Sequence, residues 1–142
     1  MKRIRYVSQF AHDLTRDEID TLVAHAAAKN ASLGVTGILM SSGRLFFQVI
    51  EGPTAHVDDL YQSIMADERH RDVLLLEADD QVTERFFPDW SMRRIDLDMD
   101  SEQRLEPIRE LLHTVIERRR ELKRMTLALE KAIWYELAAG AE

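Results

Sequence analysis

Apolar residues in the first hundred positions fall into short runs, and two segments between these runs have helical spacing. The first helix is predicted to begin at Thr15, where the threonine hydroxyl and the Glu18 carboxylate can accept hydrogen bonds from unpaired backbone amides as a capping box. The second opens at Gly52-Pro53-Thr54. The order βαββαββ is typical of an α+β, ferredoxin-like sandwich. The predicted strands cover residues 4–8, 35–40, 45–51, 73–76 and 86–92.

One polar side chain, Gln48, lies inside the apolar run Leu-Phe-Phe-Gln-Val-Ile. A buried amide costs about 1–3 kcal/mol for each group without a partner. Taken alone, Gln48 is best interpreted as an ordinary half-buried polar residue of a strand. Tyr6 on the first strand and Asn30 after the first helix are, however, the partners expected if a polar ring system lies among the three. Taken alone, Tyr6 would instead anchor its strand by the ring.

The C-terminal segment is predicted to be helical, since neither Gly nor Pro occurs between Pro107 and Ala139. Its apolar residues recur at three- and four-residue steps, interrupted at Arg119. This pattern allows two helices packed on the back of the sheet or one long helix that forms a dimer seam. Arg119 at a seam position favours a break nearby, and therefore two helices. We divide the chain into a folded domain over residues 1–97 and a helical cap, output or dimerisation segment over residues 98–142.

The composition indicates a soluble globular protein, because 45% of the 142 residues are hydrophobic and 32% are charged. The net charge is −7, and from position 101 onward eight acidic residues balance eight basic ones. The excess acid therefore lies in the first hundred positions, and direct nucleic-acid binding is disfavoured. No apolar run approaches the roughly 20 residues that span a membrane. Cysteine is absent and no secretory signal occurs, so we expect a cytoplasmic protein.

Motifs for catalysis and metal binding are weak. The five histidines include no His-Glu-x-x-His pair, and the chain has no nucleophile elbow, Walker loop or GxGxxG run. We therefore expect neither a metal site nor enzyme activity.

Six fragments occur in order along the first part of the chain: Tyr6-Val7-Ser8, Asn30-Ala31-Ser32-Leu33-Gly34-Val35-Thr36-Gly37-Ile38-Leu39, Phe47-Gln48-Val49-Ile50-Glu51-Gly52, Leu60-Tyr61, Asp67-Glu68-Arg69-His70 and Arg85-Phe86-Phe87-Pro88-Asp89-Trp90-Ser91-Met92. Each fragment is modest alone, but their joint order and spacing are specific. With them the chain resembles the BLUF domain family, flavin-binding sensors of blue light, over about residues 1–95. The fold implied by this resemblance is the same sandwich that the pattern predicts.

The resemblance implies FAD as the cofactor, held non-covalently with its isoalloxazine ring between the two helices. Asn30 would then hydrogen-bond the polar edge of the ring, and Gln48 would bridge the flavin and Tyr6. Ser63 stands where some members carry arginine, and Ala26-Ala27 where a Ser-Arg pair is common, which predicts weaker contacts to the phosphates. The other implied contacts are Leu22 and Ile64 on the ring faces, Lys29 beside the ring, and Asp67, Arg69 and His70 near the ring or its ribityl chain.

The implied mechanism is a light-driven switch. Tyr6 would donate an electron and a proton to the excited flavin, and the return transfer would leave Gln48 rotated or tautomerised, with a red shift of the absorption. The last strand carries Trp90 and Met92, either of which could occupy the space beside Gln48, unless both are plain core residues. The signal would pass through the tail to an unidentified downstream protein, with the chain acting as a homo-oligomer.

Two other classes of function stay open on the sequence alone. A ferredoxin-like dimeric interaction scaffold without photochemistry would purify colourless. A flavin-dependent enzyme would be yellow but insensitive to light, and the sequence offers no reductant-binding site for it.

Overall fold

The computed structural model describes residues 1–98 and 105–140, and it forms two compact units, Met1–Glu106 and Pro107–Glu142. The first unit is an α+β sandwich in the predicted order βαββαββ, and the second is a helix. The elements are β1 (Lys2–Phe10), α1 (Arg16–Leu33), β2 (Thr36–Ser42), β3 (Leu45–Gly52), α2 (Thr54–Ala66), β4 (His70–Asp79), β5 (Arg93–Asp96) and α3 (Glu106–Gly140).

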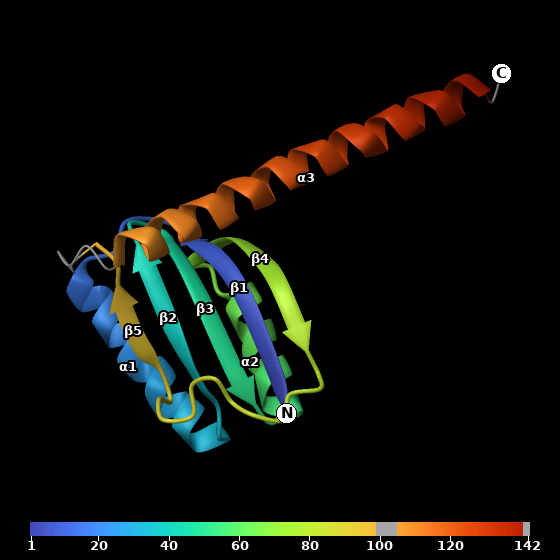
Figure 1. The fold of residues 1–142 in the computed structure, drawn as a ribbon. Coiled ribbons are helices and arrows are strands. Elements are labelled where there is room, and N and C mark those ends of the chain that lie inside the picture. The colour runs from blue at the N-terminus through green and yellow to red at the C-terminus, as the bar shows by residue number, and fades with distance from the viewer. Residues whose placement is uncertain (99–104, 141–142) are drawn as a thin grey trace. The chain divides into compact units, whose positions relative to one another are not determined.

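The five strands form one mixed sheet in the order β4-β1-β3-β2-β5. All neighbours are antiparallel except β2 and β5, which are parallel. Helices α1 and α2 cover the same face of the sheet (Figure 1). The core lies between this face and the two helices, and its buried residues are Ile4, Tyr6, Phe10, Ile19, Val23, Val35, Leu39, Phe46, Ile50, Val57 and Met92.

The register of β1 against β3 decides which side chains share a face. Tyr6 lies directly opposite Gln48, and Arg3 lies directly opposite Glu51. Because successive residues of a strand point to opposite faces, the first pair lies on the face toward the helices and the second pair on the other face. The two central strands therefore carry one polar pair on each side of the sheet.

The predicted capping box at the start of α1 is confirmed. The Glu18 amide donates to the Thr15 hydroxyl at 3.2 Å, and the Thr15 amide donates to the Glu18 carboxylate at 3.2 Å. At the other end Gly34 ends the helix with φ of 67°, a left-handed conformation that glycine adopts without a steric penalty. The two caps fix the length of α1 and place its last turn beside β2.

The predicted last strand over residues 86–92 is wrong. These residues form no regular element, and the strand begins only at Arg93. Pro88 has no backbone N–H to donate to a neighbouring strand. The amides of Phe86 and Phe87 donate to the Glu51 carboxylate at 3.2 and 2.6 Å, so they are not available to a sheet either.

The preference for two helices in the tail is also wrong. α3 is one helix of 35 residues from Glu106 to Gly140. Arg119 does not break it, because arginine is a good helix former and a charge on one face leaves the backbone hydrogen bonds intact. Whether this helix is a cap or a dimer seam stays a prediction. No helix among the described residues is long and apolar enough to cross a membrane.

Gly37→Ala is expected to destabilise the sandwich by about 2–3 kcal/mol, because a Cβ there would lie 2.0 Å from the Val49 carbonyl oxygen and force β2 away from β3. Denaturant unfolding measures this loss. The matched control is Gly43→Ala, where a Cβ meets open space and only the positive φ of 56° costs about 1 kcal/mol. Equal losses in the two variants would contradict the close approach at Gly37.

Candidate functional site

Tyr6 and Gln48 form a buried polar pair at the centre of the sheet. Tyr6 is 0% exposed and Gln48 is 6% exposed, and the Tyr6 hydroxyl donates a hydrogen bond to Gln48 Oε1. The Tyr6 ring is held edge-on by Phe46 and Tyr61, with centroids 6.0 and 5.7 Å away. Burial raises the pKa of the Tyr6 hydroxyl far above its ordinary value of 10, and the nearby Tyr61 raises it further. The phenol therefore keeps its proton.

Met92, and not Trp90, lies beside Gln48. Gln48 Nε2 donates to Met92 Sδ at 3.7 Å, and a thioether is a weak acceptor. Trp90 is 37% exposed and stacks on Phe87 at 6.2 Å, with the Arg93 guanidinium 4.5 Å above its ring. The amide of Gln48 is therefore held firmly on its oxygen side and weakly on its nitrogen side.

Asn30 presents an acceptor without a partner. It lies in the last turn of α1 and is 1% exposed, and its Nδ2 donates to the Ser91 carbonyl at 2.8 Å. Its Oδ1 is buried and has no hydrogen-bond partner. A buried polar atom left unpaired is costly, so this oxygen is suited to a ligand that carries an N–H donor.

A cavity of about 210 Å³ opens between α1, α2 and the sheet. A second, larger hollow of about 410 Å³ lies beside this cavity along the first turns of α1. Leu22, His25 and Arg69 line both the cavity and the hollow. The eight residues predicted from the sequence to contact a cofactor all line the cavity, and Met92 does as well. They are Leu22, Lys29, Asn30, Gln48, Ile64, Asp67, Arg69 and His70.

Sequence reasoning missed other residues of the lining. Leu60 lies one helical turn before Ile64, so the helical period alone could have found it. Leu39 lies opposite Gln48 in the β2–β3 register, which the sequence does not specify without the pairing. The remaining ones are Val23, His25, Ala26 and Ser63, of which Ala26 and Ser63 were named only as departures from the family pattern.

Asp67, Arg69 and His70 form the charged end of the cavity. The Arg69 guanidinium donates to the Asp67 carboxylate at 3.0 Å and lowers the pKa of Asp67 to about 2. Burial lowers the pKa of His70 below its ordinary value of 6.5, while Asp67 opposes that shift. The His70 ring packs against Phe46, with ring centroids 5.0 Å apart.

These residues fit the polar edge of a flavin. That edge carries one N–H donor between two carbonyl acceptors, and the cavity offers the unpaired Asn30 Oδ1 as an acceptor beside the Gln48 amide. Leu22 and Ile64 come from the two facing helices and supply the apolar walls that a flat aromatic ring requires. Among the described residues, no three His, Cys, Asp or Glu side chains gather as a group that could hold a metal ion.

The model of the family "BLUF: Sensors of blue-light using FAD" matches residues 1–93. This chain belongs to the BLUF family, whose description is of sensors of blue light that use FAD.

Among known proteins, the β subunit of the photoactivated adenylate cyclase of Euglena gracilis is 35% identical over 103 residues, which are 71% of this chain and 12% of that protein. A bacterial light-regulated adenylyl cyclase structure superposes with a TM-score of 0.81 at 36% identity, over 87% of this chain and 36% of the other. The dark-state structure of BlrB, a BLUF protein, superposes with a TM-score of 0.64 at 35% identity. The match covers 68% of this chain and 73% of the BlrB chain. The chain thus spans only a minor part of the cyclases that it matches.

The free energy of unfolding of the flavin-free protein is expected to fall as the pH drops below about 6.5. The unfolded chain protonates His70 near 6.5, whereas the folded chain resists protonation because its His70 pKa is lowered, so acid favours unfolding by at most about 1.4 kcal/mol per pH unit. Asp67 changes the free energy of unfolding in a separate pH range, because its stabilising effect is lost only as the pH falls from about 4 toward 2.

Denaturant unfolding between pH 7.5 and 5 measures this slope. His70→Gln should make it shallower, and the exposed His56→Gln is the matched control. An equal slope in wild type and His70→Gln would show that His70 is not the group responsible.

Proposed function

We propose that the cavity holds FAD, and that blue light acting on it rearranges the hydrogen bonds of Gln48 and so changes how the chain binds a downstream protein. The observation that carries this proposal is the asymmetric environment of Gln48. One end of its amide accepts a hydrogen bond from a buried tyrosine, and the other end meets only the sulfur atom of Met92. Gln48 and Met92 both line the cavity.

Asn30, Gln48, Leu22 and Ile64 would hold the isoalloxazine ring. Lys29 would lie beside the ring, and Asp67, Arg69 and His70 near the ring or its ribityl chain. When bound, the flavin supplies absorption of blue light and, in its excited state, oxidising power. FAD rather than a shorter flavin is supported by the family's own description and by the hollow that adjoins the cavity past Arg69. Extraction of the bound flavin and its separation by chromatography identifies it.

The protein's part in the light reaction begins with Tyr6. Because burial raises its pKa, Tyr6 cannot provide a phenolate, and loss of an electron from its ring must be accompanied by movement of its proton. The nearest acceptor is Gln48 Oε1, to which the hydroxyl already donates. The proton can therefore move along this hydrogen bond to Gln48 Oε1 as the electron leaves the Tyr6 ring for the excited flavin.

Gln48 can then turn, because the Tyr6 hydroxyl that donates to its oxygen can also accept a hydrogen bond from its Nε2. Turning the amide gives up the weak Nε2 contact with Met92 and exchanges the groups that face Tyr6 and the cavity. An altered hydrogen bond is worth on the order of 1 kcal/mol, which is enough to shift a balanced local equilibrium. A donor gained at the flavin carbonyl accounts for the expected red shift.

The output is proposed to pass through contacts with other chains rather than through catalysis by this one. The second half of α3, over residues 125–140, carries only Glu130, Lys131 and Glu136 as charged residues. A helix that is apolar on all sides is normally buried against a partner. This supports a homo-oligomer or a downstream protein at that end, and a cytoplasmic setting is part of the same proposal.

Tyr6→Phe and Gln48→Leu are expected to keep flavin bound and to lose the reversible red shift, because each removes one member of the pair that moves the proton. Absorption spectra before, during and after blue illumination test this. Tyr135→Phe, outside the sandwich, is the matched control and should shift like the wild type. A reversible red shift that persists in both site variants would contradict the assignment.

Asn30→Ala is expected to weaken flavin binding by about 3- to 30-fold, because it removes the unpaired Oδ1 acceptor and frees the Ser91 carbonyl. Titration of the flavin-free protein with FAD, followed by flavin fluorescence, measures the affinity. The control is Asn30→Asp, which keeps an acceptor and should lose less. An affinity equal to that of the wild type in Asn30→Ala would remove Asn30 from the site.

A further inference from the structure

A carboxylate on the far side of the sheet is more deeply buried than any charged group in the cavity. Glu51 is 0% exposed and lies three positions after Gln48 on β3, so it points away from the helices. Its partner across the β1–β3 register is Arg3, whose Nε donates to Glu51 Oε2 at 2.8 Å. Burying such a pair is costly, and the light reaction proposed above does not use it.

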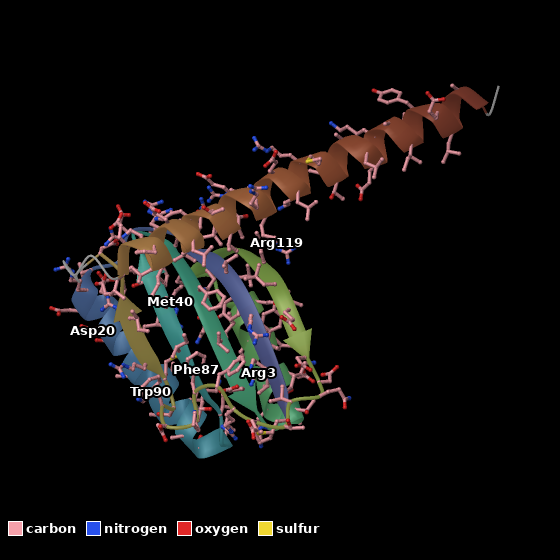
Figure 2. All side chains as sticks on the ribbon, viewed as in Figure 1. Arg3, Asp20, Met40, Phe87, Trp90 and Arg119 are labelled. Carbon is pink, nitrogen blue, oxygen red and sulfur yellow. The ribbon has the colours of Figure 1, made fainter. Side chains whose placement is uncertain are left out.

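The other ligands of Glu51 come from the irregular segment before β5. The amides of Phe87 and Phe86 donate to its two carboxylate oxygens at 2.6 and 3.2 Å. Arg3 extends the same contact, since its Nη2 donates to the Glu84 carbonyl at 2.7 Å and its guanidinium lies 4.1 Å above the Phe86 ring. Figure 2 shows Arg3 and Phe87 on the side of the sheet that faces away from α1 and α2.

The same segment reaches the cavity only a few residues later. The Gly37 amide donates to the Trp90 carbonyl at 2.9 Å, Asn30 donates to the Ser91 carbonyl, and Gln48 donates to Met92 Sδ. Figure 1 shows the connection from β4 passing the ends of β1 and β3 before it turns into β5. β3 is therefore touched twice by one segment, at Glu51 on one face and at Gln48 on the other.

Residues 84–92 contain no strand or helix, so their position depends on these side-chain contacts. A carboxylate that accepts hydrogen bonds from two consecutive amides fixes the backbone at Phe86 and Phe87. Only four residues separate Phe87 from Met92, so few backbone bonds can absorb a displacement at one end. The position of Met92 Sδ therefore depends in part on the contacts of Glu51 on the opposite face of the sheet.

Building on the proposed function, we propose that Glu51 is a positioning residue of the light switch: with Arg3 it fixes residues 84–87 to β3 and thereby holds Met92 against Gln48. Release of this contact leaves the cavity and Tyr6 in place. It gives the Met92 side chain more room to move while the Gln48 amide rotates. The barrier to the return rotation is therefore lower, and the lit state decays faster.

The test uses Glu51→Gln, which keeps the size of the side chain but presents an N–H to Arg3 or to the two amides. Because this leaves Arg3 buried without its charge partner, a double variant, Arg3→Met with Glu51→Met, is made in parallel. Replacement of a buried ion pair by apolar side chains of similar volume is often neutral for folding. The matched control is Glu77→Gln, which removes the same charge from the exposed pair with Arg5 on the neighbouring strand.

Two quantities are measured. Amide hydrogen exchange at Phe86 and Phe87, with and without flavin, should accelerate about tenfold or more in both Glu51 variants and stay unchanged in Glu77→Gln. Dark recovery of the red-shifted absorption should be at least about threefold faster in the Glu51 variants, with flavin still bound.

Unchanged exchange at Phe86 and Phe87 would show that Glu51 does not hold the segment. Faster exchange with an unchanged red shift and recovery would reduce Glu51 to a structural residue, and either result overturns the proposal. A wild type without any reversible shift would overturn the proposed function itself, and the exchange data would then report on the segment alone.

Discussion

A glutamine in the middle of a buried strand has to be given hydrogen-bond partners, and much of this fold serves that requirement. Gln48 lies on the central strand β3, where β1 supplies Tyr6 directly across the register. The irregular segment before β5 supplies Met92. Because the sulfur satisfies the amide poorly, the site is stable enough to fold and loose enough to change. The switching proposed for Gln48 depends on that imbalance.

The sheet extends the influence of the site to its opposite face. Strand β3 carries Gln48 toward the helices and Glu51 away from them, and residues 84–92 contact both. Arg85 adds to this attachment by donating to Thr36 and to the Gly34 carbonyl at 2.9 and 2.8 Å. A change at Gln48 therefore bears on a segment whose aromatic side chains Phe86 and Trp90 lie at the surface. The path from cavity to surface is short and lies within the first unit.

Most of the site could be predicted because its residues have strong local signals. The Thr15 capping box placed the start of α1 and with it Leu22, and the apolar runs placed Tyr6 and Gln48 on two strands. The sequence predicts Asn30 after this helix, but it lies in the last turn of α1. The last strand could not be predicted, because the amides of Phe86 and Phe87 bond to the Glu51 side chain instead of to a neighbouring strand. The sequence likewise could not choose between Trp90 and Met92, since that depends on the path of an irregular segment.

The most direct test of the account is light-minus-dark infrared difference spectroscopy of flavin-loaded protein labelled with ¹³C at the glutamine side-chain carbonyl, with Gln48→Leu as the reference. The account predicts a label-sensitive amide band that shifts under blue light, recovers in the dark together with the visible absorption, and is missing in Gln48→Leu. A flavin carbonyl band that shifts and recovers while no label-sensitive band moves would contradict it.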